Sequence, residues 1–324
     1  MTAHQAWRFG VVGCGRMGHL HSERLQADGR GQVVALFDES PEAARRLQQE
    51  KAASARLCSS FEDLLATEPL DAVVICTPTT AHFDQVHASL ARGVHVLCEK
   101  PLAESRQRIL DLIAAAGRSD RHCMLAYQRR FWWTYRTLRR EVRSGQWGPI
   151  RAVTSHNVER WQQTIAGTWR DDPAVNVGGF VGDAGSHKID AVFYVTGLAP
   201  VDAWARSQNQ GSHVQVNTSV SGRLAGDVLL CMDFIGNAQY LGEDLHIHCE
   251  HADLMLRDRK VWIAEGNAVR ELTDPEPDSN PDVGFLDLLD GVGKNIAPFD
   301  CALPVWDLTA AILQSGEQGT LVEL

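Results

Sequence analysis

The sequence predicts an α/β protein, with βαβ units that form a parallel sheet in its first part and an antiparallel sheet after it. Up to about residue 126, apolar runs of strand length alternate with segments of helical period. Beyond that point, longer segments alternate polar and apolar residues with period two, which is typical of antiparallel strands with one solvated face. We therefore expect two domains, 1–126 and 127–324.

The first expected element is a strand that ends in a glycine-rich turn. The apolar run from Arg8 leads into Gly13, Gly15 and Gly18, spaced as G-x-G-x-x-G. In this motif the first glycine permits the tight turn, the second lets a pyrophosphate approach the backbone, and the third lets the helix pack on the strand. Taken alone, the motif is also compatible with an ordinary glycine-rich turn. If it holds phosphates, they lie at the helix N-terminus, and the further contacts expected there are Arg16 and Met17.

An acidic residue follows the second expected strand. Asp38 ends the apolar run Val33–Phe37 and lies twenty residues after Gly18. Its carboxylate is placed to accept hydrogen bonds from adenosine ribose hydroxyls and to repel a 2′-phosphate. Strand, glycines, helix and acid together predict a dinucleotide site that takes NAD in preference to NADP.

Two further strands bring polar residues to the same edge of the sheet. The strand Ala72–Cys76 is followed by a Thr-Pro-Thr-Thr turn and by a helix that ends at Gly93. The strand Val94–Cys98 places Glu99 and Lys100 at its carboxyl end, where an open α/β sheet binds its ligands. The remaining elements expected here are a helix over Glu104–Ala116, stopped by Gly117, and a strand over Cys123–Tyr127.

The second part is expected to hold one helix among several strands. The helix covers about Val181–Val195 and ends at Gly197. The acidic, proline-rich stretch Thr273–Asp282 is expected to form an exposed loop. The expected strands are Arg151–Glu159, Val214–Leu224, Asp227–Phe234, Asp244–Cys249 and Lys260–Ala264.

Composition excludes several classes of partner. The 324 residues carry a formal net charge of −10, which opposes binding to nucleic acid or to an anionic membrane. No window reaches the roughly 18 apolar residues of a membrane span, and the N-terminus lacks a secretion signal, so we expect a cytoplasmic protein. The eight cysteines form no C-x-x-C pair, and free, mostly buried thiols are expected.

Lys100 is the first residue with expected chemistry. Pro101 fixes φ and removes a donor, so the backbone leaves the strand abruptly and the lysine side chain can project into a cleft. A lysine in a partly desolvated cleft polarises a substrate oxygen or shares its proton. The alternative is a solvated lysine beside Glu99.

A second group of residues lies within the segment Gly178–Asp190. Asp183, His187 and Asp190 are spaced i, i+4 and i+7, so they are expected to share one helix face. A histidine oriented by a carboxylate can take a hydroxyl proton while hydride leaves the same carbon. The alternative is a surface ion pair, but the glycines clustered here favour a close approach of backbone or ligand.

Two conspicuous features are expected to be structural. The segment Phe131–Gly148 mixes aromatic residues with arginines, yet Leu138 and Val142 continue a helical core stripe, so helix packing is expected rather than nucleic-acid binding. The histidines of the other feature resemble a metal cluster, but a neighbouring Cys249 points to the opposite strand face, and no metal is expected. Those histidines are His246, His248 and His251.

The chain resembles the glucose–fructose oxidoreductase / inositol dehydrogenase / rhizopine catabolism (Gfo/Idh/MocA) family over nearly its whole length. The resemblance implies an N-terminal Rossmann domain with a doubly wound parallel sheet, a nicotinamide cofactor, and sugars or cyclitols as substrates. It also implies a C-terminal α/β domain whose large open, mainly antiparallel sheet commonly mediates a dimer or tetramer. The motifs that carry it are GCGRMGHLH at 13–21, the acid of ALFDES, ICTPTTAH at 75–82, CEKP at 98–101, YQRRF at 127–131 and GG…DAGSHKID at 178–190.

The resemblance also implies roles for single residues. Lys100 matches the family's cleft lysine, His187 its proton-transfer histidine, and Asp183 the acid that contacts substrate or orients that histidine. Asp190 is expected to lie behind them. The expected cofactor contacts are Thr77, Pro78, Thr79, His82, Glu99, Lys100 and Gln128, and the expected substrate contacts are Arg129, Trp169 and Arg170. The alternative for Trp169 and Arg170 is that they only anchor a loop. Thr79 departs from the asparagine of many members, which leaves that local cofactor contact open.

These residues predict a dehydrogenase that oxidises a secondary alcohol of a sugar, sugar derivative or cyclitol. His187 takes the hydroxyl proton, Lys100 stabilises the developing alkoxide, and the cofactor supplies the redox chemistry. Two alternatives stay open at this point. One is a redox-neutral NAD-dependent glycoside hydrolase or epimerase, and the other is a catalytically silent sensor of sugar and NAD.

Overall fold

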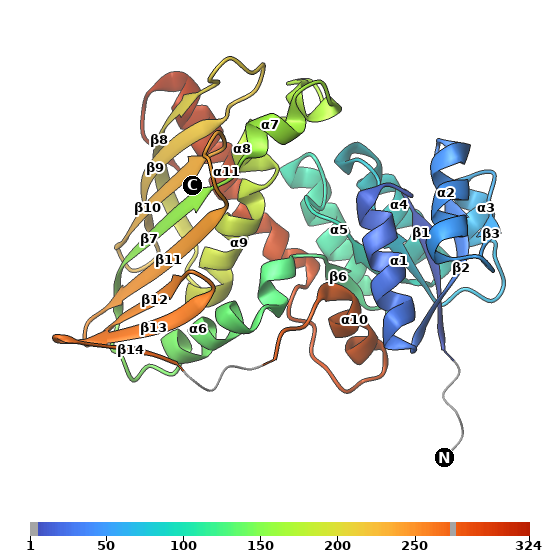
Figure 1. Cartoon of the computed structure of the whole chain (residues 1–324), viewed down its shortest axis with the longest axis horizontal. Coiled ribbons are helices and arrows are strands. Elements are labelled where there is room, and N and C mark those ends of the chain that lie inside the picture. Colours follow the sequence, from blue (N-terminus) through green and yellow to red (C-terminus); the bar gives the residue numbers. More distant parts are fainter. Residues whose placement is uncertain (1–5, 273–276) are drawn as a thin grey trace. The chain divides into compact units, whose positions relative to one another are not determined.

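A computed structural model describes residues 6–272 and 277–324. The chain forms two compact units (Figure 1). The first comprises Met1–Gln128 and Ser279–Leu303, and the second comprises Arg129–Asp278 and Pro304–Leu324. The sequence did not reveal that a late segment belongs to the first unit.

The first unit is built on a six-stranded sheet in the order β3-β2-β1-β4-β5-β6. Every neighbouring pair in it is parallel. The central strands are apolar and fully buried, as expected of a sheet that helices cover on both faces. The strands are β1 (Trp7–Val12), β2 (Gly31–Phe37), β3 (Arg56–Leu57), β4 (Ala72–Ile75), β5 (His95–Cys98) and β6 (Cys123–Leu125). The predicted fold class is confirmed for this unit.

The helices of the first unit form two groups. One consists of α1 with α2 and α10, and the other of α4 with α3 and α5. As predicted, α4 ends at Gly93, whose φ of 77° is left-handed. The predicted stop at Gly117 is wrong, because α5 continues through it to Arg118 and ends at Ser119. The bounds are α1 (Arg16–Asp28), α2 (Pro41–Lys51), α3 (Phe61–Leu65), α4 (Thr79–Arg92), α5 (Arg106–Arg118) and α10 (Pro281–Leu289).

Helix α10 lies within the late segment of the first unit. Its first turn is capped by Asn280, whose side chain accepts hydrogen bonds from the two following backbone amides, and Pro281 fits its first position. It packs on the unit through Phe285, whose ring centroid lies 6.3 Å from that of Phe9. The loop expected over 273–282 therefore ends in a helix start, and its residues 273–276 lie outside the described part.

The second unit is built on a nine-stranded sheet in the order β14-β13-β12-β11-β7-β10-β9-β8-β15. Its pairs are antiparallel except for β7 with β10, so the predicted mainly antiparallel sheet is confirmed. The strands are β7 (Ile150–Val158), β8 (Pro200–Gln208), β9 (Asn217–Leu224), β10 (Val228–Ile235), β11 (Gly242–Cys249), β12 (Asp253–Arg257), β13 (Lys260–Glu265), β14 (Ala268–Glu271) and β15 (Val322–Glu323).

Helices cover one face of this large sheet (Figure 1). Helix α6 contacts α9, β12 and β13, and α9 contacts β7. The aromatic and arginine-rich segment is largely α6, and its buried residues include Tyr135, Leu138 and Val142, as expected for helix packing. The helices are α6 (Trp133–Arg143), α7 (Trp161–Ile165), α8 (Gly179–Gly182), α9 (Gly185–Thr196) and α11 (Ala302–Gln318), with a short 3₁₀ turn at Trp169–Asp171. Two other 3₁₀ turns are Gln128–Phe131, at the boundary of the two units, and Phe299–Cys301, in the first unit.

Candidate functional site

In the glycine-rich turn, close packing excludes a side chain at Gly13 and at Gly18, but not at Gly15. A Cβ on Gly13, whose φ is 87°, would lie 2.6 Å from the backbone of Cys76. A Cβ on Gly18 would lie 2.2 Å from the carbonyl oxygen of Gly13. A Cβ on Gly15 would meet nothing within 4 Å. Since Gly15 precedes the first turn of α1, this open space fits a pyrophosphate approaching the free amides of a helix N-terminus.

The predicted acid, Asp38, connects the glycine-rich turn to the start of α2. One carboxylate oxygen accepts the backbone amide of Cys14 at 2.6 Å, and the other accepts that of Ser40 at 2.8 Å. Each ionised oxygen can accept more than one hydrogen bond, so the carboxylate can also receive ribose hydroxyls. Asp38 therefore fits both a structural role in this turn and the ribose-binding role that the sequence predicts.

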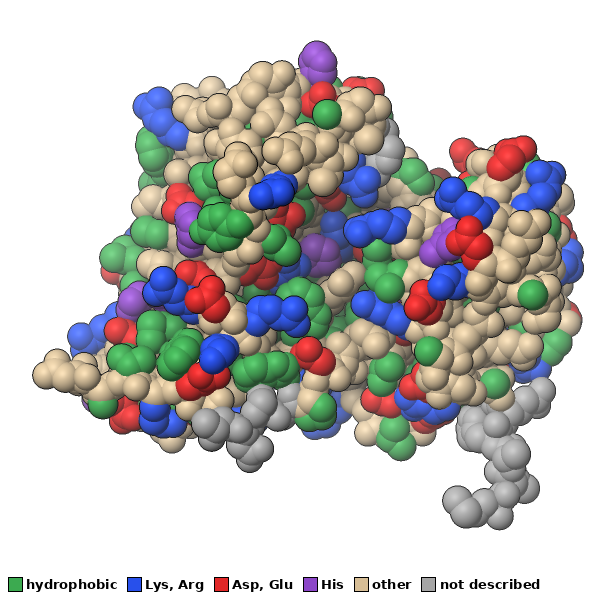
Figure 2. All heavy atoms as spheres, in the orientation of Figure 1, with side chains coloured by type: hydrophobic (Ala, Val, Ile, Leu, Met, Phe, Trp, Pro, Cys, Tyr) green, Lys and Arg blue, Asp and Glu red, His purple; other side chains and the backbone are tan. Residues whose placement is uncertain are grey.

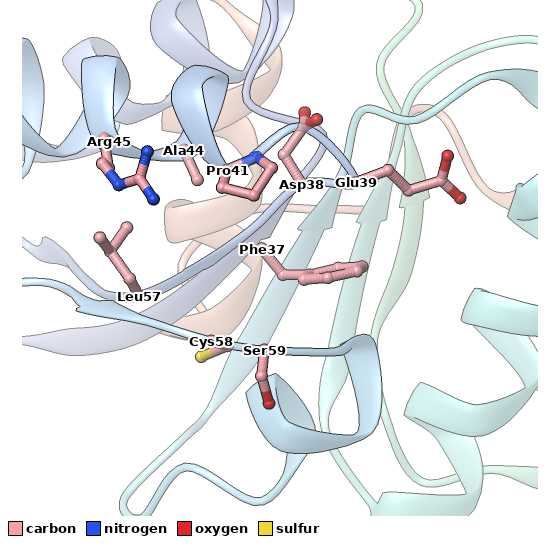
Figure 3. Close-up of a pocket in the computed structure, with 9 residues that line it drawn as sticks. All are labelled: Phe37, Asp38, Glu39, Pro41, Ala44, Arg45, Leu57, Cys58 and Ser59. Carbon is pink, nitrogen blue, oxygen red and sulfur yellow. The ribbon is translucent and has the colours of Figure 1, made fainter.

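A cavity of about 400 Å³ lies beside this acid (Figure 3). It offers an apolar wall from Leu57 and a cation from Arg45, neither of which the sequence analysis identified. A mixed apolar and polar cavity at the end of β2 fits the adenosine part of a dinucleotide. The lining residues are Phe37, Asp38, Glu39, Pro41, Ala44, Arg45, Leu57, Cys58 and Ser59.

Lys100 follows the carboxyl end of β5, as predicted, and Glu99 anchors its backbone. The Lys100 amide donates to Oε2 of Glu99 at 3.1 Å. The other oxygen of Glu99 faces Nε2 of His21 at 3.2 Å. Burial alone would raise the pKa of Glu99, but its contacts with His21 and Lys100 lower that pKa. The side chain of Glu99 is buried against the protein, so its contact with a cofactor stays a prediction.

His21 and Asp282 were missed by the sequence analysis. Nδ1 of His21 lies 2.6 Å from Oδ1 of Asp282, and both side chains are fully buried. Burial alone would lower the pKa of the His21 imidazole, but Asp282 and Glu99 outweigh it and raise that pKa to about 10. The available signal for His21 was its place on the buried face of α1, in line with Gly18 and Leu25. No local signal links it to Asp282, 261 positions away.

His82 holds the two loops that carry the other predicted cofactor contacts. Its Nδ1 lies 2.8 Å from the carbonyl oxygen of Pro101, and its Nε2 lies 2.9 Å from that of Thr77. Burial lowers the pKa of this imidazole. Thr77 also donates to Gln85 at 2.6 Å. Pro78 and Thr79 form the start of α4. The direct cofactor contacts of these residues stay predictions.

In the second unit, Glu243 on β11 gathers three donors. Its carboxylate accepts from Nε of Arg129 at 2.8 Å, from the hydroxyl of Tyr135 at 2.7 Å, and from the ammonium of Lys188. Lys188 also donates to Glu159 at 2.7 Å. The structure therefore places the predicted substrate residue Arg129 in a buried ion network that supports the neighbour of His187. The sequence analysis missed Glu243, because β11 alone does not reveal the helices that pack over it.

The expected single helix face for Asp183, His187 and Asp190 is not formed. The chain breaks between α8 and α9, and Asp183 lies in the break with φ −83° and ψ −92°. Asp190 is fully buried and accepts hydrogen bonds from Arg130, including Nε to Oδ2 at 2.9 Å and Nη2 to Oδ1 at 2.6 Å. Asp190 therefore anchors α9 through Arg130, and its expected place behind the catalytic residues stays a prediction.

Asp183 is oriented by two donors that the helix break brings to it. Its Oδ2 accepts from Nε1 of Trp161 and from Nε of Arg170, each at 3.1 Å. The predicted residue Arg170 is thus close to the predicted acid, and Trp161 is an addition that the sequence analysis missed. His187 lies in the first turn of α9, three residues beyond the break. The side chain of Trp169, also a predicted contact, lies outside the described part.

The glycines around Asp183 are explained by packing. A Cβ on Gly179, whose φ is 53°, would lie 2.2 Å from the carbonyl oxygen of Gln215. A Cβ on Gly185 would lie 2.9 Å from the carbonyl oxygen of Phe180 and 3.1 Å from the ring of Phe234. The expected close approach is therefore one of backbone and side chains within the unit.

The histidines that resemble a metal cluster in the sequence do not form one among the described residues. His248 faces Asp253 across two strands, with Nδ1 and Oδ1 2.9 Å apart. Within residues 6–272 and 277–324, no group of three or more His, Cys, Asp or Glu side chains is arranged to hold a metal ion. Over the same residues, no helix has the length and apolar character needed to cross a membrane.

The eight cysteines are free thiols, and burial raises the pKa of Cys14 to about 12.

The fold of the first unit, together with its glycine-rich turn and the cavity at Asp38, defines a class of protein. A parallel six-stranded sheet with a glycine-rich turn, an acid after β2 and a nucleoside-sized cavity is a dinucleotide-binding Rossmann domain, here followed by a unit built on a large sheet. Residues 7–127 match the family model for an oxidoreductase family with an NAD-binding Rossmann fold, and residues 135–255 match the GFO/IDH/MocA C-terminal domain. The chain belongs to the Gfo/Idh/MocA oxidoreductase family, and its first unit is an NAD-binding domain.

Named relatives agree with this membership. The chain is 30% identical over 259 residues to inositol 2-dehydrogenase of Acidothermus cellulolyticus, covering 77% of this chain and 71% of that protein. It is 28% identical over 204 residues to inositol 2-dehydrogenase of Rhizobium meliloti, covering 61% of this chain but only 57% of that protein. The chain thus spans less than two thirds of some relatives that it matches.

Solved structures support the fold alone. An inositol dehydrogenase homolog complexed with NAD⁺ from Azotobacter vinelandii has a TM-score of 0.86 at 20% identity, over 99% of this chain and 98% of that one. An oxidoreductase domain protein from Kribbella flavida has a TM-score of 0.88 at 20% identity, over 98% of this chain and 99% of that one.

Proposed function

We propose that this protein is an NAD-dependent dehydrogenase that transfers a hydride between the cofactor and a secondary alcohol of a sugar, sugar derivative or cyclitol. The observation that carries the proposal is the carboxyl edge of the parallel sheet. There, the open space at Gly15 follows β1, the cavity at Asp38 follows β2, and Lys100 follows β5. Relatives named inositol 2-dehydrogenase support the choice of substrate class.

The proposed roles follow from the chemistry of each side chain. When bound, the nicotinamide supplies the hydride acceptor. His187 accepts the hydroxyl proton, and the ammonium of Lys100 stabilises the negative charge that develops on the alcohol oxygen. Asp183, held by Trp161 and Arg170, contacts the substrate or orients His187. Arg170 and Trp169 are proposed to reach further substrate hydroxyls. Arg129 is proposed to line the site, where its hydrogen bond to Glu243 holds it in place.

The cofactor preference is the next part of the proposal. Asp38 lines the cavity at the end of β2 with its carboxylate, which accepts ribose hydroxyls and repels a 2′-phosphate. Arg45 lines the same cavity and would attract that phosphate. We give more weight to Asp38, because its two backbone hydrogen bonds fix it beside the glycine-rich turn, whereas the Arg45 side chain is mostly exposed.

The test is an absorbance assay for reduced nicotinamide, with NAD or NADP, across inositols, aldoses and glycosides. The wild type is expected to reduce NAD with at least one of them, and Lys100→Ala and His187→Ala to abolish the signal. Lys51→Ala and His87→Ala are matched controls, because both side chains lie at the surface of the first unit and outside the proposed site. If glycosides are cleaved or isomers form without net reduction, a redox-neutral enzyme replaces this proposal. Binding of NAD and sugar without any turnover indicates a sensor.

We also propose that the protein acts in the cytoplasm as a homo-oligomer assembled through the large sheet. The face of that sheet opposite α6 and α9 presents Leu229, which is 59% exposed, in register with Arg223 and Ala152 on its neighbours. The proposal rests on the resemblance to the family, whose C-terminal sheet commonly mediates oligomers, and Leu229 gives a position on that face at which to test it. Light scattering of wild type and Leu229→Lys tests this: a dimer or tetramer that the substitution dissociates supports it, and a wild-type monomer contradicts it.

On the face drawn in Figure 2, acidic and basic side chains are intermixed rather than gathered by sign. Together with the net charge of −10, this supports a small-molecule substrate over nucleic acid.

A further inference from the structure

We infer that His21 is a positioning residue for Lys100. Its imidazole joins Glu99 to Asp282 of α10 and thereby holds the backbone that presents the lysine. The kinetic part of this inference rests on the proposed function, whereas its structural part does not.

With Asp282 and Glu99 both ionised, the hydrogen-bond geometry requires a proton on both ring nitrogens. Nδ1 faces a carboxylate oxygen of Asp282 at 2.6 Å, and Nε2 faces one of Glu99 at 3.2 Å. An ionised carboxylate can only accept, so each contact is a hydrogen bond only if the ring nitrogen donates. His21 is therefore an imidazolium in this arrangement. It is also fully buried, so water cannot replace either partner.

The surrounding charges keep this buried cation in balance. Arg24 of α1 approaches the other oxygen of Asp282, with Nη1 and Oδ2 3.7 Å apart. Two cations thus oppose two carboxylates, which is the condition under which buried charges are tolerated. The other titratable groups that face this cluster are Lys100 after β5, His82 on α4, and the thiols Cys76 and Cys98 at the ends of β4 and β5.

Glu99 links His21 to the backbone of Lys100 through its two carboxylate oxygens. Its Oε1 is held by the imidazole, and its Oε2 receives the Lys100 amide at 3.1 Å. Both oxygens of the carboxylate are therefore fixed, and with them the peptide group before Lys100. On the other side, the carbonyl oxygen of Pro101 faces His82 at 2.8 Å. A buried histidine thus holds each flank of the lysine.

Removing His21 changes what Glu99 has to pair with. Its buried carboxylate would lose the imidazolium and keep the Lys100 amide, and of the two cations that lower its pKa the ammonium of Lys100 would remain. We expect Glu99 to draw that ammonium toward it and away from a substrate oxygen. The expected defect is in the reaction step rather than in NAD binding, because the glycine-rich turn and the Asp38 cavity are not part of this cluster.

The experiment uses the full-length protein and three variants. His21→Gln removes the imidazolium, and Asp282→Asn removes the charge that faces its second proton without changing its size. Asp290→Asn is the matched control, because Asp290 also fastens α10 to the unit, through Trp7 at 2.8 Å and Arg30 at 2.9 Å, but lies at the opposite end of α10 from Asp282. The readouts are imidazole NMR, the ¹³Cε signal of Lys100 in lysine-labelled protein near neutral pH, and steady-state kinetics with NAD.

The expected wild-type spectrum shows both ring N–H protons of His21. His21→Gln and Asp282→Asn are expected to shift or broaden the Lys100 signal, and Asp290→Asn to leave it unchanged. With an alcohol that the wild type oxidises, His21→Gln is expected to lower kcat about 10- to 100-fold, which is the scale of a misplaced reacting group, with KM for NAD changed less than about twofold.

Other results overturn the inference. A singly protonated His21 in the wild type, or a Lys100 signal that neither His21→Gln nor Asp282→Asn alters, removes its basis. An equal change in Asp290→Asn reduces it to a general loosening of α10. If His21→Gln does not fold, the isosteric Asp282→Asn decides. If the wild type oxidises no alcohol, the proposed function fails while the two NMR readouts still decide the role of His21.

Discussion

Arg130 and Asp190 form a buried ion pair in which the guanidinium donates to both oxygens of one carboxylate, through Nε at 2.9 Å and through Nη2 at 2.6 Å. Asp190 is fully buried, and Arg130 also lies over the ring of Tyr194, with 5.0 Å from its guanidinium carbon to the ring centroid. Burial raises the pKa of the Asp190 carboxyl group, and Arg130 opposes that rise. The pair therefore fixes α9, the helix that carries His187, to the segment before α6.

Asp190→Ala is expected to destabilise the protein by about 3–5 kcal/mol, because it leaves the Arg130 charge buried without its carboxylate. Urea unfolding followed by circular dichroism measures this. The double variant Arg130→Met/Asp190→Leu is expected to recover much of the loss, since it removes both charges. A single Asp190→Ala variant as stable as the wild type would contradict the structure of this pair.

Gly15→Ala and Gly18→Ala are expected to fail in different ways. A Cβ at position 18 would lie 2.2 Å from the Gly13 carbonyl oxygen, so Gly18→Ala should lower the thermal midpoint strongly. A Cβ at position 15 has open space, so Gly15→Ala should keep the wild-type midpoint and lose affinity for NAD. Thermal melts and NAD titration by fluorescence separate the two effects. Wild-type affinity in Gly15→Ala would show that no phosphate approaches there.

Asp38→Asn is expected to move the cofactor preference toward NADP. The neutral amide no longer repels a 2′-phosphate, and Arg45 in the same cavity can attract it. We expect the ratio of NADP to NAD affinity to rise at least about tenfold, which corresponds to ~1.4 kcal/mol. In Asp38→Asn/Arg45→Gln most of that rise should disappear. A ratio that Asp38→Asn leaves at its wild-type value would place the selectivity elsewhere.

The stability of the first unit is expected to fall as the pH rises above neutrality. His21 has a folded pKa of about 10 against an ordinary value of 6.5, so its stabilising effect is complete below pH 6.5 and is lost as the pH rises through 10. Between these values the slope approaches about 1.4 kcal/mol per pH unit. Urea midpoints of wild type and His21→Gln across this range test it: the wild type should lose stability faster, and parallel curves would contradict a charged His21.

The features that the sequence predicts best are local. Gly13, Gly15 and Gly18 lie within one turn, and Asp38 and Lys100 each follow a strand that its own apolar residues identify. Strand ends in a parallel sheet converge on one edge whatever the rest of the chain does. Short stretches of sequence are therefore enough to predict the fold class and the residues expected to bind the nucleotide.

The features that it misses depend on distant partners or on single backbone angles. Glu243 has no local sign of its role, because its donors Arg129 and Lys188 come from segments over fifty positions away. The break at Asp183 depends on close packing around Gly179 and Gly185, which a helical spacing rule ignores. Helix α10 did carry a signal, Asn280 followed by Pro281, but the acidic and proline-rich residues before it outweighed that signal in the prediction of a loop.

The late position of α10 in the chain has a consequence for synthesis on the ribosome. The segment Ser279–Leu303 belongs to the first unit, yet it is made only after all of β7 to β14. Until then the nascent first unit lacks Phe285 against Phe9 and has no carboxylate opposite Nδ1 of His21. The first unit is therefore translated first but completed late. A chain that terminates before residue 279 would contain a nucleotide-binding domain that lacks α10 and its core residue Phe285.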